Sequence, residues 1–270
     1  MFMVGSFAGV GLGLAPRDAL APLRNARFVA LTLTVSWVVS PAIAYLVLHL
    51  IAIEPPYATG LLLLALAPCA PFAPAMVQTA RGDPAYLAAF TVLSAAVTVV
   101  VMPLAVPVLV QGLSADPITI ARPLLLFVLL PLLAGTIVKS IHGRAAERLR
   151  SPVALLTNIV GGALMVALVV VFGRAVYDAI GSYAILTQIV FLVALGLAAH
   201  VLGGGLSDRQ RSVVTIGVCT RNLGAALAPL TAVDGDPRAI VMIAIGAPVT
   251  IAVSAIVARW LGRRAVSAGR

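Results

Sequence analysis

The residues of this sequence best suited to chemistry are few, and most of them lie inside apolar segments. Arg221 is the one clear charge within a long apolar stretch. A guanidinium at membrane depth indicates a functional role, because burying it unpaired is costly. It could bind a carboxylate, sulfonate or phosphate through two parallel hydrogen bonds. It could also cap backbone carbonyls as a structural cation or extend toward the headgroups, and the sequence leaves these interpretations open.

Two cysteines and a group of hydroxyl side chains are the other candidates. Cys69 and Cys219 could coordinate a soft thiophilic species, although a buried cysteine is usually inert. Thr91, Ser94 and Thr98 are spaced by three and four residues, which places them on one helix face. There they could bind a ligand or pack between helices. The sequence contains no nucleophile–base pair, metal-ligand cluster or nucleotide loop, so we expect no enzyme activity, no metal and no cofactor.

The composition is that of a polytopic membrane protein. Hydrophobic residues make up 61% of the chain, charged residues 10%, and the mean hydropathy is +1.12. A soluble domain would be about half apolar and about one-quarter charged. Roughly 20 apolar residues cross a bilayer as a helix, so the fold class expected is all-α and integral to the membrane. The nine segments that we predict to be transmembrane helices are 1–14, 28–53, 57–80, 85–113, 123–141, 152–173, 183–206, 212–233 and 239–261.

The cations predict the orientation of these spans. They concentrate in every second loop and in the C-terminal tail, whereas the other loops hold only Arg122, Arg174 and Arg238. By the positive-inside rule the cation-rich loops are cytoplasmic. The N-terminus is then outside and the C-terminus inside, in the inner (plasma) membrane. Topology thus explains the net charge of +9, and we expect the lipid bilayer, not nucleic acid, as the partner.

A repeated motif indicates where the functional site lies. Gly-Asp-Pro occurs at residues 82–84 and 235–237, each time after an apolar segment that is broken in its middle. The breaks are at 68–74, which holds three prolines, and at 217–224, which has glycine at both ends. Asp followed by Pro is a typical start of a helix. Paired interrupted helices in the two halves of a membrane protein indicate a transporter's binding site.

The predicted orientation places the two motifs on opposite faces of the membrane. Matching breaks and turns of opposite direction predict an inverted repeat, with residues 1–113 as the first unit and 114–270 as the second. Each unit of such a repeat would hold five helices, so the first unit here is expected to lack its first helix. Both units belong to a single membrane domain.

The residues around these motifs resemble the bile acid:sodium symporter family and its superfamily neighbour, the arsenite-efflux permeases. The resemblance is strongest at Ala80-Arg81-Gly82-Asp83 with the following Thr91 and Ser94, and over residues 217–228. It implies two inverted five-helix units, with crossed discontinuous helices in a core domain beside a panel domain. It also implies a secondary transporter that moves a small organic anion by alternating access.

The resemblance also implies that the family's sodium sites are degenerate here. Side chains that hold sodium in relatives correspond to Ala73, Pro74, Thr215 and Cys219, and only Thr91 is retained. A hard cation needs several oxygen ligands, so sodium coupling is expected to be altered or absent, with Arg221 as a fixed charge in its place. The substrate or ion site that we predict consists of Cys69, Ala73, Pro74, Thr91, Ser94, Thr215, Gly217, Cys219, Thr220, Arg221 and Asn222.

Two alternatives remain at this point. The arsenite permeases share the cysteine of the first break and a run like that at residues 82–86, but Ala226 lies where they carry an acidic residue, which disfavours metalloid efflux. The second alternative is a transport-inactive scaffold or sensor that keeps the fold.

Overall fold

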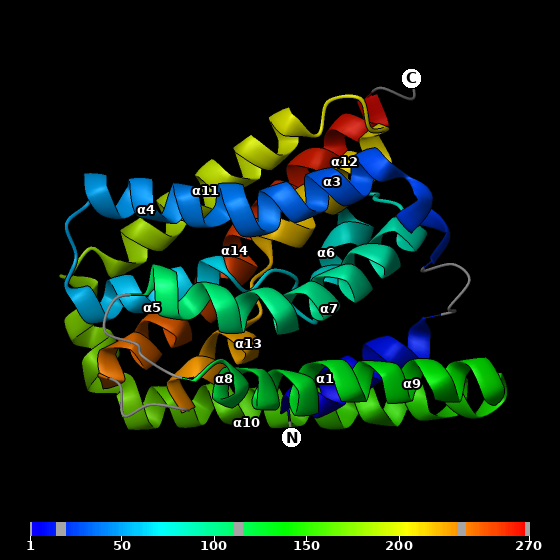
Figure 1. The fold of residues 1–270 in the computed structure, drawn as a ribbon, viewed down its shortest axis with the longest axis horizontal. Coiled ribbons are helices and arrows are strands. Elements are labelled where there is room, and N and C mark those ends of the chain that lie inside the picture. The colour runs from blue at the N-terminus through cyan, green and yellow to red at the C-terminus, as the bar shows by residue number, and fades with distance from the viewer. Residues whose placement is uncertain (1, 15–19, 111–115, 232–235, 268–270) are drawn as a thin grey trace.

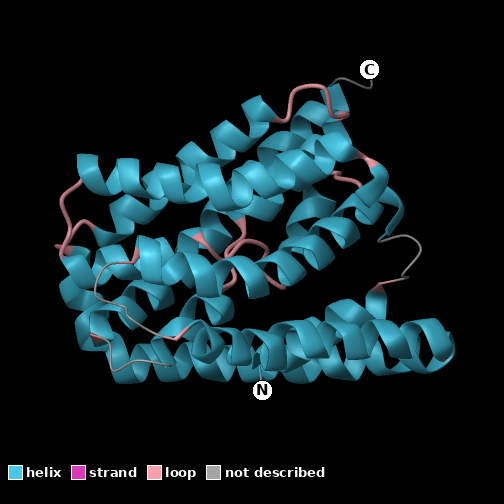
Figure 2. Cartoon of the chain, in the orientation of Figure 1, coloured by secondary structure: helices cyan, strands magenta, loops and turns pink. Residues whose placement is uncertain are grey.

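The computed structural model describes residues 2–14, 20–110, 116–231 and 236–267, and every regular element among them is a helix (Figure 2). A π-helical turn, Val35–Val39, joins α3 to α4, and another, Leu125–Leu129, joins α8 to α9. The helices are α1 (Phe2–Gly13), α3 (Ala26–Thr34), α4 (Ser40–Leu50), α5 (Pro55–Ala65), α6 (Ala73–Thr79), α7 (Pro84–Leu109), α8 (Pro117–Leu124), α9 (Leu130–Ile141), α10 (Gly143–Ile180), α11 (Ala184–Leu202), α12 (Asp208–Cys219), α13 (Leu223–Leu227) and α14 (Pro237–Ser267).

Five continuous helical runs in the described part are long and apolar enough to cross a bilayer. They are Ala26–Leu50, Pro84–Leu109, Pro117–Ile141, Ala184–Leu202 and Pro237–Val266. An all-helical protein with several apolar spans is therefore confirmed. The other predicted spans correspond to α1, to α10 and to the interrupted pairs α5–α6 and α12–α13, so the count of nine remains a prediction.

The helices form two parts that pack face to face (Figure 1). α1, α10 and the continuous run formed by α8 and α9 lie side by side in what we call the four-helix layer, and the remaining helices form the main body. α1 packs along both α9 and α10. Where α1 meets α9, a Cβ on Gly11 or Gly135 would collide with backbone atoms of the facing helix. These glycines therefore permit the close backbone approach that is typical of helices packed in membranes.

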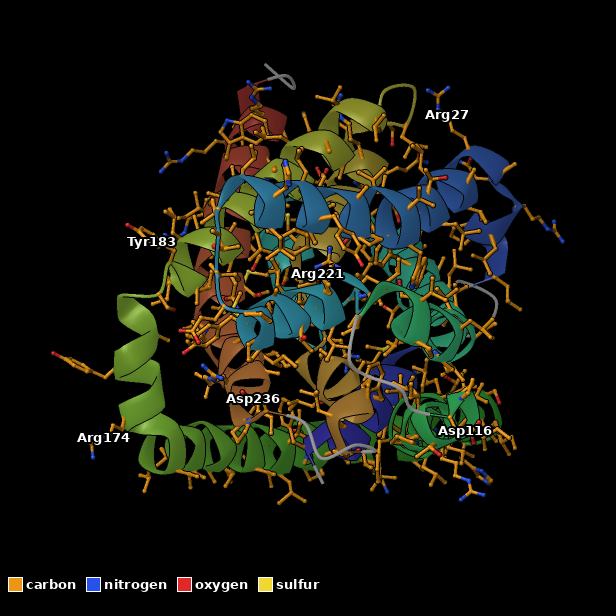
Figure 3. All side chains as sticks on the ribbon, turned by 60° about the vertical axis from the view of Figure 1, so that its left-hand side comes forward. Arg27, Asp116, Arg174, Tyr183, Arg221 and Asp236 are labelled. Atoms are coloured by element: carbon orange, nitrogen blue, oxygen red, sulfur yellow. The ribbon has the colours of Figure 1, made fainter. Side chains whose placement is uncertain are left out.

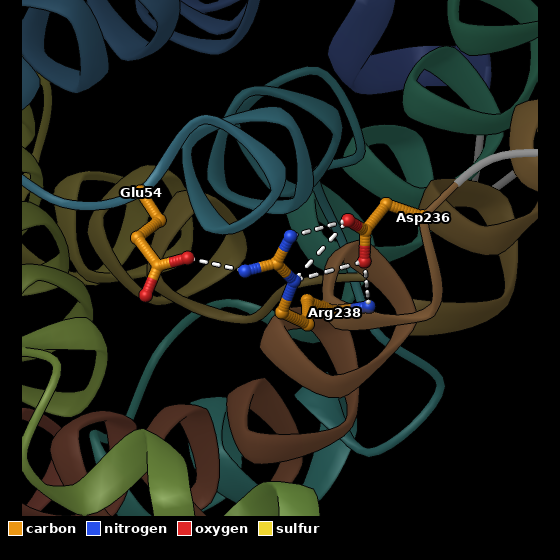
Figure 4. Close-up of polar contacts among 3 residues, drawn as sticks. All are labelled: Glu54, Asp236 and Arg238. Atoms are coloured by element: carbon orange, nitrogen blue, oxygen red, sulfur yellow. Dashed lines mark hydrogen bonds and ion pairs between the residues drawn. The ribbon is translucent and has the colours of Figure 1, made fainter.

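The Asp-Pro pairs of both motifs begin helices, as predicted, and Gly235 lies outside the described residues. The Asp83 carboxylate accepts hydrogen bonds from the backbone N–H groups of Ala85 (2.9 Å) and Tyr86 (3.3 Å) at the start of α7. Asp236 accepts from the backbone N–H of Arg238 at 2.9 Å and from its guanidinium at 2.7 Å. These bonds lower the pKa of the Asp236 carboxyl. The Arg238 guanidinium also pairs with Glu54, which directly precedes α5 (Figure 4).

The helix that contains one predicted span is longer than that span. The segment 152–173 was expected to be a span between loops, but α10 runs over 38 residues from Gly143 to Ile180. The apolar stretch begins near residue 152, but the helix already begins at Gly143. The residues before 152 are helical because arginine, glutamate and leucine are good helix formers whether or not they lie in lipid. Glu147 in this extension pairs with Lys139 of α9 at 3.1 Å.

Candidate functional site

The two interrupted helices meet inside the main body. α5 ends at Ala65 and α6 begins at Ala73, and α12 ends at Cys219 and α13 begins at Leu223. Residues of the two breaks then pair as an isolated antiparallel β-bridge, Pro68 with Arg221. The crossing of discontinuous helices that the family resemblance implies is therefore present among the described residues. We call residues 66–72 and 220–222 the first and second break.

Backbone hydrogen bonds join the two breaks. The N–H of Cys69 donates to the carbonyl of Gly217 at 3.1 Å, and the N–H of Asn222 donates to the carbonyl of Ala67 at 2.9 Å. An unpaired peptide group in hydrocarbon costs several kcal/mol, roughly the value of a lost hydrogen bond in an apolar medium. Each break thus supplies partners that the other lacks, and neither would be stable at this depth alone.

The second break is shorter than predicted. The sequence indicated an interruption over 217–224, but α12 continues to Cys219 and only residues 220–222 leave the helix. Gly217 therefore lies inside α12, where a Cβ would collide with the Phe90 ring of α7. The absence of a side chain at Gly217 permits α12 to pack closely against α7. Gly217 is not part of the unwound segment. The glycine at 224 likewise makes room for the side chain of Met3.

Cys69 has an unusual backbone conformation. Its φ of +66° lies in the left-handed region, which costs a non-glycine residue about 1–2 kcal/mol. Such strain is typical of functional sites that the surrounding structure holds in place. The Cys69 thiol lies 3.5 Å from the Thr91 hydroxyl, and Thr91 also donates to the carbonyl of Leu87 at 2.9 Å. The first break therefore contacts α7 at Thr91, and both Cys69 and Thr91 belong to the predicted site.

Arg221 is the most deeply buried charge in the described part of the chain, with 1% of its surface exposed. Figure 3 places it near the centre of the molecule. Its Nη1 donates to the carbonyls of Ala65 (3.2 Å) and Leu64 (3.4 Å). Its guanidinium carbon lies 5.4 Å from the centroid of the Phe191 ring. Its Nε and Nη2 have no hydrogen-bond partner among the described residues.

The position of this guanidinium has an electrostatic reason. Helix α5 ends at Ala65 and α12 ends just before Arg221, so the C-termini of two helices meet here. Each helix C-terminus carries roughly −0.5 of an elementary charge. The two together equal about one negative charge, which one guanidinium balances. Of the three interpretations of Arg221, the contacts fit the cation that caps backbone carbonyls.

The remaining predicted site residues differ in how their polar groups are satisfied. The Thr215 hydroxyl donates to the Arg211 carbonyl at 3.0 Å, and the Thr220 hydroxyl donates to the Ile216 carbonyl at 3.0 Å. The Asn222 side chain accepts from the backbone N–H of Ala225 at 3.1 Å and so caps α13. The Cys219 thiol points toward α11, 3.8 Å from the Leu192 carbonyl. Ala73 and Pro74 form the first turn of α6, and Ser94 is buried without a hydrogen-bond partner among the described residues. The crossing itself thus collects Cys69, Gly217, Arg221 and Asn222.

Two cavities lie between the four-helix layer and the main body. One, of about 420 Å³, is lined by α1, α10, α7 and the end of the first break, and it includes Pro74, Thr91 and Arg150. The other, of about 610 Å³, is lined mainly by α10, α13 and α14. Both are lined by Phe2, Phe72 and Asn158. We call them the polar cavity and the apolar cavity.

Sequence reasoning missed three of the residues that line these cavities. Arg150 was assigned to a cytoplasmic loop, and neither Phe72 nor Asn158 was singled out. Asn158 could have been found as a lone carboxamide within an apolar span. The described residues include no group of three or more His, Cys, Asp or Glu side chains that could hold a metal ion.

Broken helices that meet within a bundle of apolar helices, beside cavities at a layer boundary, define a multi-pass membrane protein of the transporter class. The sequence profile of the Sodium Bile acid symporter family matches residues 1–179, about two-thirds of the chain. The protein belongs to this family. No curated protein matches the sequence. The profile match includes the first break and Arg150 but ends before Arg221.

Proposed function

We propose that this protein is a secondary transporter of an organic anion that works by alternating access and without a bound sodium ion. The observation that carries the proposal is the guanidinium of Arg221, which donates to the carbonyls at the end of α5. A cation-binding crossing would require a mobile ion to balance these helix ends. Here a covalently attached charge does so.

The side chains around the crossing support this proposal. Ala73 and Pro74 have no side-chain oxygen, and the Thr215 hydroxyl bonds to its own helix. The Cys219 thiol faces α11 and not the first break. Sodium prefers several oxygen ligands, as hard cations do. The side chains that the family resemblance assigns to sodium therefore offer no carboxylate or carboxamide oxygen, and their two hydroxyls, those of Thr91 and Thr215, each donate to a carbonyl of their own helix.

We further propose nine membrane crossings arranged as two inverted units, residues 1–113 and 114–270. The five long spans, α1, α10 and the two broken pairs would make up the nine. The repeat is supported by the capped starts of α7 and α14, which lie at opposite ends of the molecule (Figure 1). The cation distribution supports an outside N-terminus and a cytoplasmic C-terminus in the inner (plasma) membrane. A C-terminal green fluorescent protein fusion that stays dark in cells would contradict this orientation.

Uptake into proteoliposomes tests the function. A panel of radiolabelled carboxylates and sulfonates, with arsenite as the metalloid member, is presented with either a sodium or a potassium gradient. We expect uptake of at least one organic anion, at equal rates in the two gradients. Uptake of arsenite alone would favour metalloid efflux. No uptake and no thermal stabilisation by any member would favour the transport-inactive scaffold.

A second measurement tests the sodium claim without knowledge of the substrate. A ligand that binds only the folded protein stabilises it by RT ln(1 + [L]/Kd), which is about 2.7 kcal/mol at a hundredfold excess over Kd. Thermal unfolding in sodium chloride and in potassium chloride of equal ionic strength should therefore give the same midpoint. A reproducible rise that is specific to sodium would show that the crossing still binds the ion.

A further inference from the structure

Another cavity lies in the main body, where the last turns of α11 and α14 meet the start of α12 (Figure 1). These three helices pack against one another. The residues that line the cavity are His200, Asp208, Arg211, Ser212, Leu261, Arg264 and Ala265. Its volume of about 350 Å³ is near the lower limit for small-molecule sites, which is about 300 Å³. We call it the basic cavity, and it shares no lining residue with the polar or the apolar cavity.

The lining of the basic cavity favours an anion. Its charged side chains are two arginines, Arg211 and Arg264, and one aspartate, Asp208. Asp208 pairs with Nη2 of Arg211, whereas Nη1 of the same guanidinium has no hydrogen-bond partner among the described residues. A Cβ added to Gly203 would collide with the Arg211 side chain, so this glycine makes room for the arginine. The N-terminus of α12 adds the positive end of a helix dipole.

Ser212 supplies a hydroxyl group that the fold does not use. The residue is only 5% exposed and lines the basic cavity. Thr215 and Thr220 of the same helix region donate to the carbonyl four residues earlier. The Ser212 side chain makes no such bond and has no other partner in the described part of the chain. Because an unpaired buried hydroxyl is unfavourable, its position beside two guanidinium groups indicates a ligand that accepts hydrogen bonds.

Trp260 places the basic cavity at the level of the lipid headgroups. Its ring is partly exposed, the guanidinium carbon of Arg264 lies 4.0 Å from the ring centroid, and the His200 ring packs edge-on at 5.2 Å. Tryptophan is enriched where a membrane meets water. Ile256, Trp260 and Arg264 are spaced by four residues and so lie on one face of α14. Ile256 is exposed, as is Val201 of α11, so apolar surface for an acyl chain adjoins the cavity.

We propose that the basic cavity binds the phosphate group of an anionic phospholipid, whose acyl chains lie along the exposed apolar surface of α11 and α14. Arg211 and Arg264 donate charge-assisted hydrogen bonds to the phosphate oxygens, and the Ser212 hydroxyl is the third donor. The cavity has room for the headgroup, and the chains stay outside it. A zwitterionic headgroup would bring its own cation beside two guanidinium groups, which disfavours it.

The side of the membrane agrees with this ligand. The distribution of cations assigns these helix ends to the cytoplasmic side. Basic pockets between transmembrane helices on that side typically bind anionic lipid headgroups. The proposal concerns a lipid that stays bound to the protein, and it does not depend on the transport function or on the crossing of the breaks.

Lipid titration of the purified, delipidated full-length protein in detergent tests the proposal. Native mass spectrometry gives the affinity for palmitoyl-oleoyl phosphatidylglycerol in the unaltered protein and in single variants. We expect Arg211→Gln and Arg264→Gln each to weaken binding by about tenfold to a hundredfold, the usual effect of a lost charge-assisted hydrogen bond. Arg264→Lys should retain part of the affinity. Arg259→Gln is the matched control, because Arg259 is exposed on the same helix and does not line the cavity, and it should change the affinity by less than twofold.

Ser212→Ala separates the site from the fold. Because this hydroxyl has no partner in the described residues, the unfolding midpoint without lipid should not change. Binding of phosphatidylglycerol should nevertheless weaken by about threefold to tenfold, as expected for one lost hydrogen bond. Equal phosphatidylglycerol affinity in Arg211→Gln, Arg264→Gln and Arg259→Gln would overturn the site.

Two further ligands test the chemistry of the lipid. Palmitoyl-oleoyl phosphatidylcholine, which has the same chains and phosphate but a cationic headgroup, should bind at least tenfold more weakly. Glycerol 3-phosphate, which has the phosphate without the chains, should also bind at least tenfold more weakly. Equal affinity for the two lipids would overturn the selectivity for an anion. Glycerol 3-phosphate that binds as tightly as the lipid would show a site for a soluble phosphate and overturn the lipid assignment.

Discussion

Replacing Arg221 with methionine separates the charge of this side chain from its bulk. The guanidinium is 1% exposed and donates to the carbonyls of Leu64 and Ala65. Methionine fills much of the same space but has no donor. The variant therefore loses two charge-assisted hydrogen bonds, which contribute about 1.5–3 kcal/mol each.

The substitution also removes an unfavourable contribution to the stability, and this contribution has a similar size. In the unaltered protein the buried guanidinium leaves Nε and Nη2 without partners among the described residues, and each such group costs about 1–3 kcal/mol. Replacing a buried charge with an apolar side chain of similar volume is often neutral or stabilising for this reason. We expect the two terms to leave Arg221→Met within about 3 kcal/mol of the unaltered protein. The corresponding shift in unfolding temperature is below about 10 °C for a chain of this size.

Transport should respond very differently. Without the guanidinium, the two helix C-termini keep about one negative charge beside the path of an anion, because Thr91 contacts both the first break and the polar cavity. We expect Arg221→Met to reduce organic-anion uptake to background while remaining folded, and Arg221→Lys to retain part of it. Arg122→Met, on the exposed surface of α8, is the matched control and should transport normally. Uptake by Arg221→Met at the rate of the unaltered protein would refute the argument.

Three further outcomes follow from the packing and the helix caps. Gly135→Ala should lower the unfolding temperature through overpacking against α1, at a cost of about 1–3 kcal/mol. The control Gly162→Ala, whose added Cβ meets nothing within 4 Å, should be neutral or stabilising by up to about 1 kcal/mol. Equal effects of the two substitutions would contradict the close contact between α1 and α9. Cys69→Val should be less stable in thermal unfolding than Cys69→Gly by about 1–2 kcal/mol, because the φ of +66° suits glycine and not a branched side chain. The reverse order of stability would exclude the left-handed conformation at this residue. Hydrogen bonds from Arg238 hold the pKa of Asp236 below its ordinary value of 3.8, so the carboxylate stabilises the fold above pH 3.8 and loses this effect as the pH falls further. Unfolding midpoints measured from pH 3 to 6 should therefore approach those of Asp236→Asn at the acidic end. A difference between the two proteins that stays constant over this range would contradict the lowered pKa.

Local rules in the sequence were sufficient to find the helix starts and the breaks. Asp before Pro supplies a carboxylate cap and a residue that needs no N–H, so α7 and α14 begin where the motifs stand. Pro68 and Pro71 of the first break remove donors, so this backbone cannot remain helical, and Pro74 lies in the first turn of α6, where no donor is needed. Arg221 was identified as a candidate only by the free-energy cost of burying a charged side chain in the membrane.

Features that depend on a distant partner could not be predicted in this way. The second break is held by hydrogen bonds to Cys69 and Ala67, which lie far away in the chain, so its length cannot be read from its own residues. Arg150 looked like a loop cation because hydropathy reports where lipid ends and not where a helix ends. Its position on the rim of the polar cavity depends on α1, through Gly13.

A fixed cation changes the energetics of transport. In a sodium symporter each sodium ion that enters contributes about 1.4 kcal/mol per tenfold gradient and about 2.3 kcal/mol per 100 mV of membrane potential. Arg221 returns with the protein in every cycle and contributes no net free energy, although it balances the same helix ends. In the sodium-independent transport that we propose, the substrate follows its own electrochemical gradient. For a monovalent anion, 100 mV negative inside favours the outside by about fiftyfold. A crossing that holds its cation covalently therefore favours export of the anion over accumulation, and a potassium potential imposed with valinomycin on the proteoliposomes measures this bias directly.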